Sequence, residues 1–554
     1  MLLWTMPNGQ KRQVEEGSTL LTFAKFFSDQ YGSPIVEGLF NNKAVDLQRP
    51  IYDDGTVDFI EVNDEQGMRV YTRTLLFMAL TAARRLYPQA TLEVRNTLGS
   101  ALYLADIGKH KLSEQAIKNI EAEMKRMAAE HTPIALRRLP KYEAISLAGP
   151  CCSEERMALL QAVPDDKLLT VYYLEGQTGY LFGSLCPDCG YVPYFELLPY
   201  DEGMIINYPD IGHWNELKPF VNMPKLNEVF QESEHWAAMI ECNTIGKLNK
   251  IIDMGYADGI IRVAEALHEK KFAQVADYIS QHRDKVKLIL IAGPSSSGKT
   301  STAQRLSVQL AVNGLRPMAI SMDDYYHNRK DTPRKPDGSY DFESIEAVDL
   351  ELFNSQLMSL LKGERVKVPK FNFRTGCREY RGKALQMAEN SILVVEGIHG
   401  LNERLTASIP EENKIKIYVS ALTPMSLDEH NRIHTTDVRL MRRLVRDSQF
   451  RSHGAVETLE LWDDVRYGEE QYIFPFQCSA NVIFNTTLIY ELAVLKKYAQ
   501  PLLEDVQPSD GRAYTIAQRL LELLWFVKPI DENAIPNNSI LREFIGGSIF
   551  KEAL

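Results

Sequence analysis

The chain has 554 residues, of which 45% are hydrophobic and 25% charged, and its formal net charge is −12 at pH 7. This is a globular composition with apolar material for several cores, so we expect three or four domains. The acidic excess argues against a dedicated nucleic-acid binder. The seven cysteines form no disulfide framework, and no apolar run approaches the roughly 18 residues that a membrane span needs, which favours a cytoplasmic protein without a membrane partner.

The first stretch, residues 1–67, contains brief apolar segments separated by turn signals such as Asp53-Asp54-Gly55. Short strands joined by turns predict a small mixed sheet that forms one domain. One helix is expected over Ser18–Ser28, with Ser18 or Thr19 as its cap, because these hydroxyls accept hydrogen bonds from the free N–H groups of a first turn.

A second unit is expected over residues 68–240. Apolar residues recur with helical spacing over Thr72–Leu86 and over Ser113–Glu130, and Ser113 is placed to cap the latter helix. Shorter apolar runs at Leu168–Leu174 and Met204–Tyr208 are typical of strands. These helices and strands predict a second domain that contains both.

Residues 241–285 are charged and helical in pattern, and we expect a helical connector there. From Val286 the chain alternates between strands and helices, which predicts a mostly parallel, doubly wound sheet over residues 286–500, followed by a C-terminal extension over 501–554. The expected strands are Val286–Ile291, Met318–Ser321, Ser391–Val395, Lys414–Val419 and Asn481–Phe484, and the main helices are Thr300–Val312, Leu350–Leu361 and Thr436–Phe450. Ligands of such sheets bind at the carboxyl ends of the strands.

Residues 293–300 read GPSSSGKT, directly between an expected strand and an expected helix. This is the phosphate-binding loop pattern in its required context, in which glycines let successive N–H groups point at phosphate oxygens. Lys299 can reach the β- and γ-phosphates, and the Thr300 hydroxyl can bind Mg²⁺. The expected ATP-binding residues are Gly293, Ser295, Ser296, Ser297, Gly298, Lys299, Thr300 and Ser301.

Two acidic positions follow strands that would end beside this loop. Asp323 and Asp324 come after Ser321, and a carboxylate there could take a proton from an acceptor hydroxyl; the alternative is a pair of helix-capping aspartates. Glu396 ends the run Ser391–Val395, where an acid can hold Mg²⁺ directly or through water; the alternative is an ordinary carboxylate at the end of a strand.

A series of arginines lies on the helix expected after residue 436. Spacings of three and four place Arg439, Arg442 or Arg443, and Arg446 on one helical face. Guanidinium groups bind phosphate oxygens and the charge that develops in phosphoryl transfer. A lid helix over ATP and a solvated basic face are both compatible with this spacing, and the phosphate loop favours the lid.

Residues 286 to about 500 resemble the uridine kinase and phosphoribulokinase family of P-loop kinases. The matching pieces are Gly293–Thr300, Ser321–Tyr326, Tyr340–Glu343, Pro369–Phe373, Val395–Gly397 and Asp437–Asp447. The resemblance implies that Asp323 is the catalytic base, that Glu396 and Thr300 hold Mg²⁺, and that Glu343 binds ribose hydroxyls. It also implies that Lys299 and the lid residues Arg439, Arg442 and Arg446 act in transfer.

The base-reading part of the site departs from that family. Uridine kinases carry a histidine that contacts the pyrimidine shortly after an aromatic pair, and here Gly376 stands at that place, after Phe371 and Phe373. Thr375 or Arg378 is the alternative contact. The expected substrate-binding residues are Tyr326, Glu343, Phe371, Phe373 and Arg378.

The N-terminal part resembles threonyl-tRNA synthetase. Residues 1–67 look like its TGS domain, a β-grasp module, and residues 68–240 look like its editing domain, in the same order, which implies an α+β fold for the second unit. The editing site of those enzymes has a helical H-x-x-x-H pair and a later C-x-x-x-H, and the corresponding positions here are Arg73, Phe77, Cys186 and Gly190. Three of the four polar groups of the editing site are missing here. We therefore expect that this domain keeps the fold but has lost the editing chemistry.

Cys186-Pro-Asp-Cys189 has the spacing of one half of a structural zinc site. A structural zinc site needs four ligands, and the adjacent Cys151 and Cys152 are badly spaced for a second pair. A turn with two free or buried thiols is the favoured interpretation.

The whole arrangement is similar to a group of bacterial nucleoside kinase-like proteins and predicts an α/β multidomain chain. We expect an ATP- and Mg²⁺-dependent kinase that acts on a nucleoside hydroxyl, most simply the 5′-OH of uridine or cytidine, or on another small ribose-like substrate. A homo-oligomer is expected. The alternative is an RNA- or tRNA-binding regulatory protein that uses the kinase fold as a nucleotide-driven switch.

Overall fold

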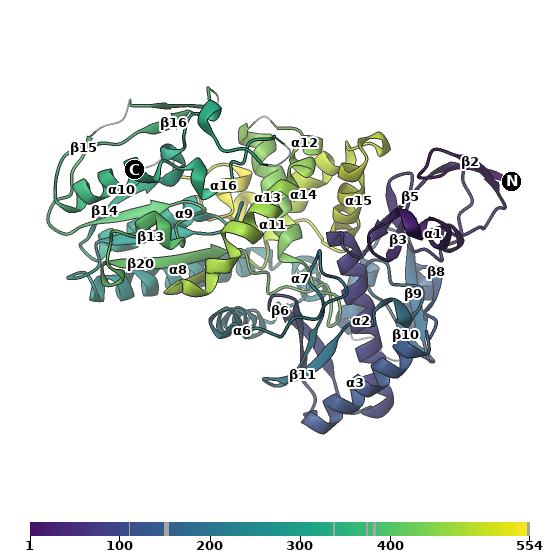
Figure 1. The fold of residues 1–554 in the computed structure, drawn as a ribbon. Helices are drawn as coiled ribbons and strands as arrows, with labels where there is room; N and C mark the ends of the chain where they lie inside the picture. The colour runs from purple at the N-terminus through teal and green to yellow at the C-terminus, as the bar shows by residue number, and fades with distance from the viewer. Residues whose placement is uncertain are drawn as a thin grey trace.

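The computed structural model describes residues 1–109, 111–148, 154–335, 338–372, 375–380, 384–451 and 453–550. The N-terminal units lie at one side of the molecule and a larger α/β unit lies at the other (Figure 1). Helices α6 (Pro224–Met239), α7 (Ile245–Asp253) and α8 (Ala257–Gln281) lie between them in sequence. None of the described helices is both long enough and apolar enough to cross a membrane.

The N-terminal unit is a five-stranded mixed sheet with one helix packed on it. Its strands are ordered β2-β1-β5-β3-β4, and only the β1–β5 pair is parallel. Trp4, Phe27 and Phe59 meet in its core. This is the β-grasp arrangement expected of the first unit. The elements are β1 (Leu2–Thr5), β2 (Lys11–Val14), α1 (Leu21–Phe27), β3 (Ile35–Phe40), β4 (Lys43–Val45) and β5 (Gly55–Glu61).

The predicted start and cap of the first helix are wrong. Helix α1 begins at Leu21, and no side chain caps it. The backbone of Ser18 is held in a bridge to Ile51, whose N–H donates to the Ser18 carbonyl at 3.0 Å. Because this pairing keeps Ser18 extended, the helix starts only after it.

The second unit packs two long helices against two antiparallel sheets. Helix α2 (Glu65–Leu86) is capped by Asp64, and α3 (Glu114–Ala129) by Ser113, whose hydroxyl accepts from the Ala116 N–H as predicted. One sheet has the order β11-β12-β7-β6 and the other β10-β9-β8. The strands are β6 (Leu92–Thr97), β7 (Ala101–Asp106), β8 (Ala135–Pro140), β9 (Leu168–Leu174), β10 (Gln177–Gly179), β11 (Glu196–Tyr200) and β12 (Gly203–Asn207).

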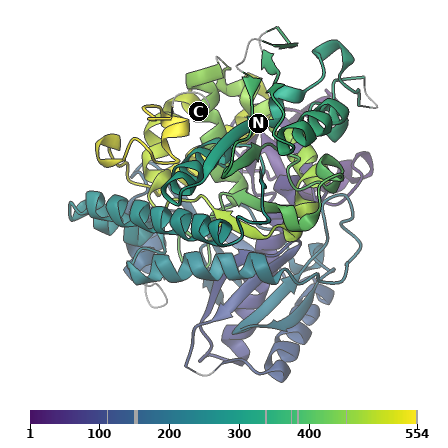
Figure 2. The same cartoon turned by 90° about the vertical axis from the view of Figure 1, so that its left-hand side faces the viewer.

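The third unit is built on a five-stranded sheet in which every pair is parallel, with the order β14-β19-β13-β20-β21. Its strands are β13 (Leu288–Ala292), β14 (Arg316–Ser321), β19 (Ser391–Glu396), β20 (Lys414–Ser420) and β21 (Val482–Asn485). Helices cover both faces (Figures 1 and 2). All five predicted strands are confirmed within two residues at each end.

Both faces of the central strand are apolar, as a parallel sheet between two helix layers requires. Leu288 and Leu290 pack toward Phe353 of α10 (Leu350–Leu361), whereas Ile289 and Ile291 pack toward the layer that contains α9 (Lys299–Val312). This two-residue alternation follows from strand geometry.

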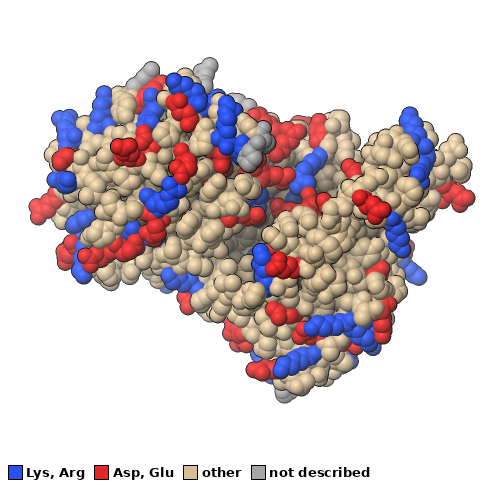
Figure 3. Space-filling view, viewed as in Figure 1, with Lys and Arg blue, Asp and Glu red and all other residues tan. Residues whose placement is uncertain are grey.

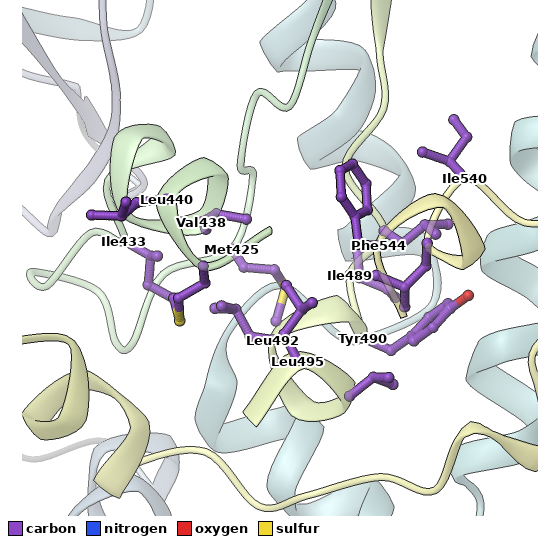
Figure 4. Packing of buried hydrophobic residues seen from close by; sticks show 14 of the residues in the cluster. Met425, Ile433, Val438, Leu440, Ile489, Tyr490, Leu492, Leu495, Ile540 and Phe544 are labelled. Atoms are coloured by element: carbon purple, nitrogen blue, oxygen red, sulfur yellow. The ribbon is translucent and has the colours of Figure 1, made fainter. Parts of the chain in front are cut away.

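The predicted helix Thr436–Phe450 is α-helical only as α11 (Thr435–Arg446) and continues as a π-helical turn over Asp447–Arg451. It is followed by α12 (Ala455–Glu460), α13 (Trp462–Tyr472) and α14 (Glu491–Glu504). The C-terminal segment adds α15 (Arg512–Trp525) and the short α16 (Arg542–Ile545). Ile540 and Phe544 of this segment lie beside Ile489 and Tyr490 in the core (Figure 4).

Candidate active site

The GPSSSGKT segment connects the central strand β13 to helix α9 at the carboxyl edge of the parallel sheet. Gly298 has φ +84°, a left-handed conformation that glycine adopts without strain. The Ser296 and Ser297 hydroxyls are buried without a hydrogen-bond partner among the described residues. Buried polar groups are normally paired, so this loop has donors available for an anion at a helix N-terminus.

Lys299, the first residue of α9, lies among carboxylates. Its Nζ donates to the Pro294 carbonyl at 3.1 Å. Burial lowers the pKa of Lys299, and the charges of Glu396 and Asp323 oppose that shift. The ammonium group therefore feels the charges of Glu396, the last residue of β19, and of Asp323, which follows β14, although the three residues come from separate parts of the chain.

The two aspartates after β14 have different surroundings. Asp324 accepts from the backbone N–H of Phe371 at 3.0 Å and lies 3.7 Å from Lys370. The Asp323 carboxylate has no hydrogen bond among the described residues, and burial raises its pKa, against the effect of Lys299. Asp324 is thus engaged in holding a neighbouring strand, whereas the Asp323 carboxylate is free to accept a proton.

Glu396 ends β19, where it is paired in register with Ser321 on one side and Ile291 on the other. The Ser321 hydroxyl donates to its Oε1 at 3.0 Å. Burial and the nearby Asp323 raise the pKa of Glu396 to about 7. Two buried acids beside one ammonium group favour an added cation, and the exposed Thr300 adds a hydroxyl oxygen of the kind that Mg²⁺ prefers. The residues present therefore fit a magnesium ion.

Two arginines of α11 contact the phosphate loop. Arg439 donates from Nε to the Ser295 carbonyl at 3.0 Å, and Arg443 donates from Nη1 to the Ser295 hydroxyl at 3.1 Å. Arg439 also forms a buried ion pair with Glu469 of α13. The helix is thus fixed to the loop through Ser295.

The other two arginines of the series point to different partners. Arg442 is fully buried, pairs with Glu491 and donates from Nη2 to the Thr486 carbonyl at 2.9 Å. Arg446 pairs with Asp447 at 3.0 Å, and its charge is felt at Lys299. The geometry brings Arg439, Arg443 and Arg446 to the loop side and turns Arg442 into the core between α11 and α14.

Two carboxylates that the sequence did not single out also contact the loop. Glu469 accepts from the Ser295 N–H at 3.0 Å. Glu543, in α16, accepts from the Ser301 N–H at 3.1 Å and from its hydroxyl at 2.7 Å. Their contacts span 174 and 242 residues of sequence, and no local motif marks either glutamate.

The side of the site away from the phosphate loop contains Tyr326, Phe371 and Glu343. The rings of Tyr326 and Phe371 meet edge to face with centroids 5.9 Å apart. Burial raises the pKa of Glu343 to about 7, and the charge of Glu469 adds to that effect. Arg378 pairs with Asp349 at 2.9 Å. Phe373 lies outside the described residues.

Gly376 forms the turn between β16 (Lys370–Asn372) and β17 (Cys377–Glu379). Its φ is +66°, and a Cβ atom there would lie 2.9 Å from Cβ of Arg329. A side chain at this position would be strained by both the backbone and its neighbour. A histidine therefore has no place at Gly376 in this loop.

The four positions compared with an editing site have mixed surroundings. Phe77 and Cys186 are almost fully buried, and a Cβ atom at Gly190 would lie 2.0 Å from the His131 ring. Arg73 is partly buried and donates to the Ser184 carbonyl. The loss of editing chemistry remains a prediction.

Burial raises the pKa of both the Cys186 and the Cys189 thiols to about 12. Among the residues that the structure describes, no group of three or more His, Cys, Asp and Glu side chains is arranged to hold a metal ion. Cys151 and Cys152 lie outside those residues.

A phosphate loop follows the central strand of a doubly wound parallel sheet, Glu396 ends the adjacent strand β19, and Asp323 follows β14, the strand beyond it. This arrangement defines a P-loop kinase domain. Consistent with this class, residues 288–490 match the family model described as the Phosphoribulokinase / Uridine kinase family.

The N-terminal part matches threonine–tRNA ligases. The ligase of Enterococcus faecalis is 27% identical over 195 residues, which are 35% of this chain and 30% of that protein. The ligase of Syntrophomonas wolfei is 24% identical over 172 residues, 31% of this chain and 27% of that protein. The chain thus spans about 30% of the length of these relatives.

Solved structures that match this chain include a "possible uridine kinase" from Bacillus stearothermophilus, with 18% identity and a TM-score of 0.26, covering 38% of this chain and 97% of that one. Another is D-glycerate 3-kinase from Cryptococcus neoformans var. grubii, with 15% identity and a TM-score of 0.25, covering 38% of this chain and 87% of that one.

Proposed function

We propose that this protein is an ATP- and Mg²⁺-dependent kinase that transfers a phosphoryl group to a nucleoside hydroxyl, most simply the 5′-OH of uridine or cytidine. The observation that carries the proposal is the position of Asp323. Its carboxylate is free of hydrogen bonds among the described residues, and the charges of Asp323 and Lys299 act on each other at the carboxyl edge of the sheet. A general base needs an available carboxylate near the transferring phosphoryl group.

The phosphate loop would hold ATP through the backbone N–H groups of residues 293–301 and through Lys299. Thr300 and Glu396 would hold Mg²⁺, which neutralises phosphate charge when it is bound. Asp323 would accept the proton of the attacking hydroxyl. Arg439 and Arg446 would stabilise the negative charge that spreads over the moving phosphoryl group, and Arg443, which also contacts Ser295, joins them in this role.

We assign Arg442 a positioning role. Its guanidinium is bonded to Glu491 and Thr486, and these contacts hold the middle of α11 against α14. A positioning role predicts that Arg442→Lys lowers thermal stability together with turnover, because lysine cannot replace the branched hydrogen bonds of arginine.

The acceptor would lie between the Tyr326–Phe371 pair and Glu343. Glu343 is the group proposed to bind the ribose hydroxyls, and the aromatic pair is proposed to border the base. Arg378 is placed at this side of the site by its pair with Asp349.

The second candidate, an RNA- or tRNA-binding regulator, is favoured by the similarity of the N-terminal part to threonine–tRNA ligases. On the face shown in Figure 3, however, Lys and Arg side chains alternate with Asp and Glu and form no continuous basic stripe. Nucleic-acid surfaces are usually marked by such a stripe, which leaves the small-molecule kinase as the better-supported function.

A transfer screen with MgATP over nucleosides, ribose derivatives and pentose phosphates tests the proposal. Lys299→Ala is expected to abolish most transfer while the protein stays folded, and Lys362→Ala, at an exposed position, is the matched control. Transfer by Lys299→Ala at the wild-type rate would overturn the kinase assignment. Absence of any acceptor together with salt-dependent tRNA binding would support the regulatory function instead.

A further inference from the structure

A cavity of about 830 Å³ lies between the N-terminal units and the kinase domain. Its walls come from α2, from the turn between β6 and β7, from the residues that precede α11, and from α13 and α15. Lys299, Asp323, Glu343 and Glu396 are not among its lining residues. These four residues therefore lie outside the cavity. Arg439 belongs to both places, since it lines the cavity and also donates to the Ser295 carbonyl of the phosphate loop. The volume of the cavity is typical of a small-molecule site.

Most charged side chains that line this cavity have an oppositely charged partner. Two guanidinium groups, those of Arg73 and Arg432, have no ion pair among the described residues. The paired cations are Lys43 with Glu522, Arg69 and Arg519 with Asp437, Lys218 with Asp210, and Arg439 and Arg466 with Glu469.

Arg432 has unused hydrogen-bonding capacity. One of its terminal nitrogens donates to the Thr97 hydroxyl, but its Nε is buried without a partner among the described residues. The guanidinium also lies over the Phe230 ring, 5.7 Å from the centroid. Burial lowers the pKa of Arg432 to about 10, so the group keeps its charge at neutral pH.

Arg73 lies against Gly183, where a Cβ atom would approach its Nη1 to 2.4 Å. Glu37 also lines the cavity, but its carboxylate accepts from Gln66 Nε2 at 3.0 Å and is not within ion-pair distance of Arg73. Burial raises the pKa of Glu37 to about 7, so this acid only partly offsets the charge of Arg73 near neutral pH.

Chain contacts bring Arg432 and Arg73 to one part of the wall. The Phe182 N–H donates to Oδ1 of Asn431, the residue before Arg432, at 2.7 Å, and Arg73 donates to the nearby Ser184 carbonyl. His434 lines the cavity as well, and burial lowers the pKa of its imidazole well below the ordinary value, with the Arg69 charge adding to this effect and Asp437 opposing it. The ring is therefore neutral and can donate or accept a hydrogen bond. Arg432, Arg73 and His434 together make a cationic, hydrogen-bonding end of the cavity.

Other parts of the wall are apolar. Phe182, Phe230 and Phe474 line the cavity together with Leu102 and Met223. An aromatic wall suits a ligand with a flat or apolar body, and the cationic end suits an anion.

We propose that this cavity binds a phosphate monoester with an aromatic body, the chemical class of a nucleoside monophosphate, with its phosphate toward Arg432 and Arg73. A phosphate monoester carries about −1.5 to −2 charges at pH 7, which matches two guanidinium groups that have no ion pair among the described residues. A carboxylate would balance only one of them. This inference does not depend on the proposed kinase activity.

Equilibrium dialysis of the full-length protein with labelled uridine 5′-monophosphate tests this site. Glu343→Ala, which disables the proposed acceptor site, is expected to retain one bound nucleotide per chain. Arg432→Gln and Arg73→Gln are each expected to weaken that binding at least about tenfold, since charged hydrogen bonds are lost. Arg365→Gln, at an exposed position, is the control. Uridine and inorganic phosphate, each lacking half of the ligand, are expected to bind more weakly than the nucleotide.

Binding that disappears in Glu343→Ala, or that survives unchanged in both arginine variants, would overturn the proposal. Tighter binding of inorganic phosphate than of the nucleotide would also overturn it, because the aromatic wall would then be irrelevant. If thermal denaturation shows that Arg432→Gln is not folded, Arg432→Lys takes its place. This variant keeps the charge without the planar fork and is expected to show an intermediate loss of nucleotide affinity. If the protein binds the nucleotide in this way but transfers no phosphoryl group, only the proposed kinase function is contradicted.

Discussion

The Glu543 carboxylate accepts a hydrogen bond from the Ser301 N–H at 3.1 Å and another from the Ser301 hydroxyl at 2.7 Å. Ser301 is the third residue of α9, so this acid lies at the helix N-terminus that the phosphate loop offers to an anion. Its neighbour Ile540 approaches Gly298, where a Cβ atom would lie 2.8 Å away. The C-terminal segment thus places a negative charge on the loop.

Glu543→Gln is expected to tighten MgATP binding several-fold. A carboxylate close to the loop repels phosphate and uses donors that phosphate needs, and the amide of glutamine removes the charge while keeping the size. Calorimetric titration with ATP measures the effect. Glu532→Gln, which alters another acid of the same segment that is paired with Lys497, is the control. Weaker ATP binding in Glu543→Gln would show that Glu543 supports the nucleotide site.

Asp323→Asn is expected to lower kcat by about 10²–10⁴-fold and to leave the affinity for ATP almost unchanged, because a general base acts on the acceptor hydroxyl. Asp324→Asn is its matched comparison, since Asp324 is engaged with the Phe371 N–H. Steady-state kinetics with varied ATP and acceptor separates the two effects. A large loss of kcat in Asp324→Asn with none in Asp323→Asn would show that Asp324, and not Asp323, is the general base.

Features of this fold that depend on contiguous residues could be predicted from the sequence. The Ser113 cap of α3 and the phosphate loop before α9 each involve only nearby residues, and both lie where the pattern placed them. The central parallel strands were also predictable, because β13 and β19 are apolar runs that are buried on two faces.

Features that depend on distant backbone contacts could not be predicted in this way. The start of α1 is set by the pairing of Ser18 with Ile51. The carboxylates of Glu469 and Glu543 reach the loop across 174 and 242 residues. The helical spacing of the arginines in α11 was correct, but the spacing could not show that Arg442 turns toward Glu491.

Glu396→Gln is expected to raise the melting temperature of the ligand-free protein at pH 8 more than at pH 5. The pKa of Glu396 is raised to about 7 in the folded protein, so between about pH 4.5 and 7 the folded state binds more protons than the unfolded state and stability falls as the pH rises. The Glu396→Gln change removes this loss of stability only at a pH at which the Glu396 carboxyl would be ionised. Melting curves of both proteins without metal at the two pH values measure the difference, and an equal shift at both would contradict the raised pKa.

The last prediction concerns selectivity among nucleosides. Gly376 leaves no polar side chain where a pyrimidine would be read, and the aromatic pair of Tyr326 and Phe371 discriminates between bases only weakly. We therefore expect kcat/KM values for uridine, cytidine, adenosine and guanosine to differ by less than about 10³-fold, since a site that hydrogen-bonds a substrate edge rejects analogues by larger factors.

Glu343→Ala is expected to lower kcat/KM for all four nucleosides by a similar factor, because the proposed contact is to the shared ribose. Glu346→Ala, which removes an exposed acid paired with Arg404, is the control. A Glu343→Ala loss confined to one nucleoside would place this carboxylate at the base, and a uridine preference above about 10³-fold would show that another side chain reads the base.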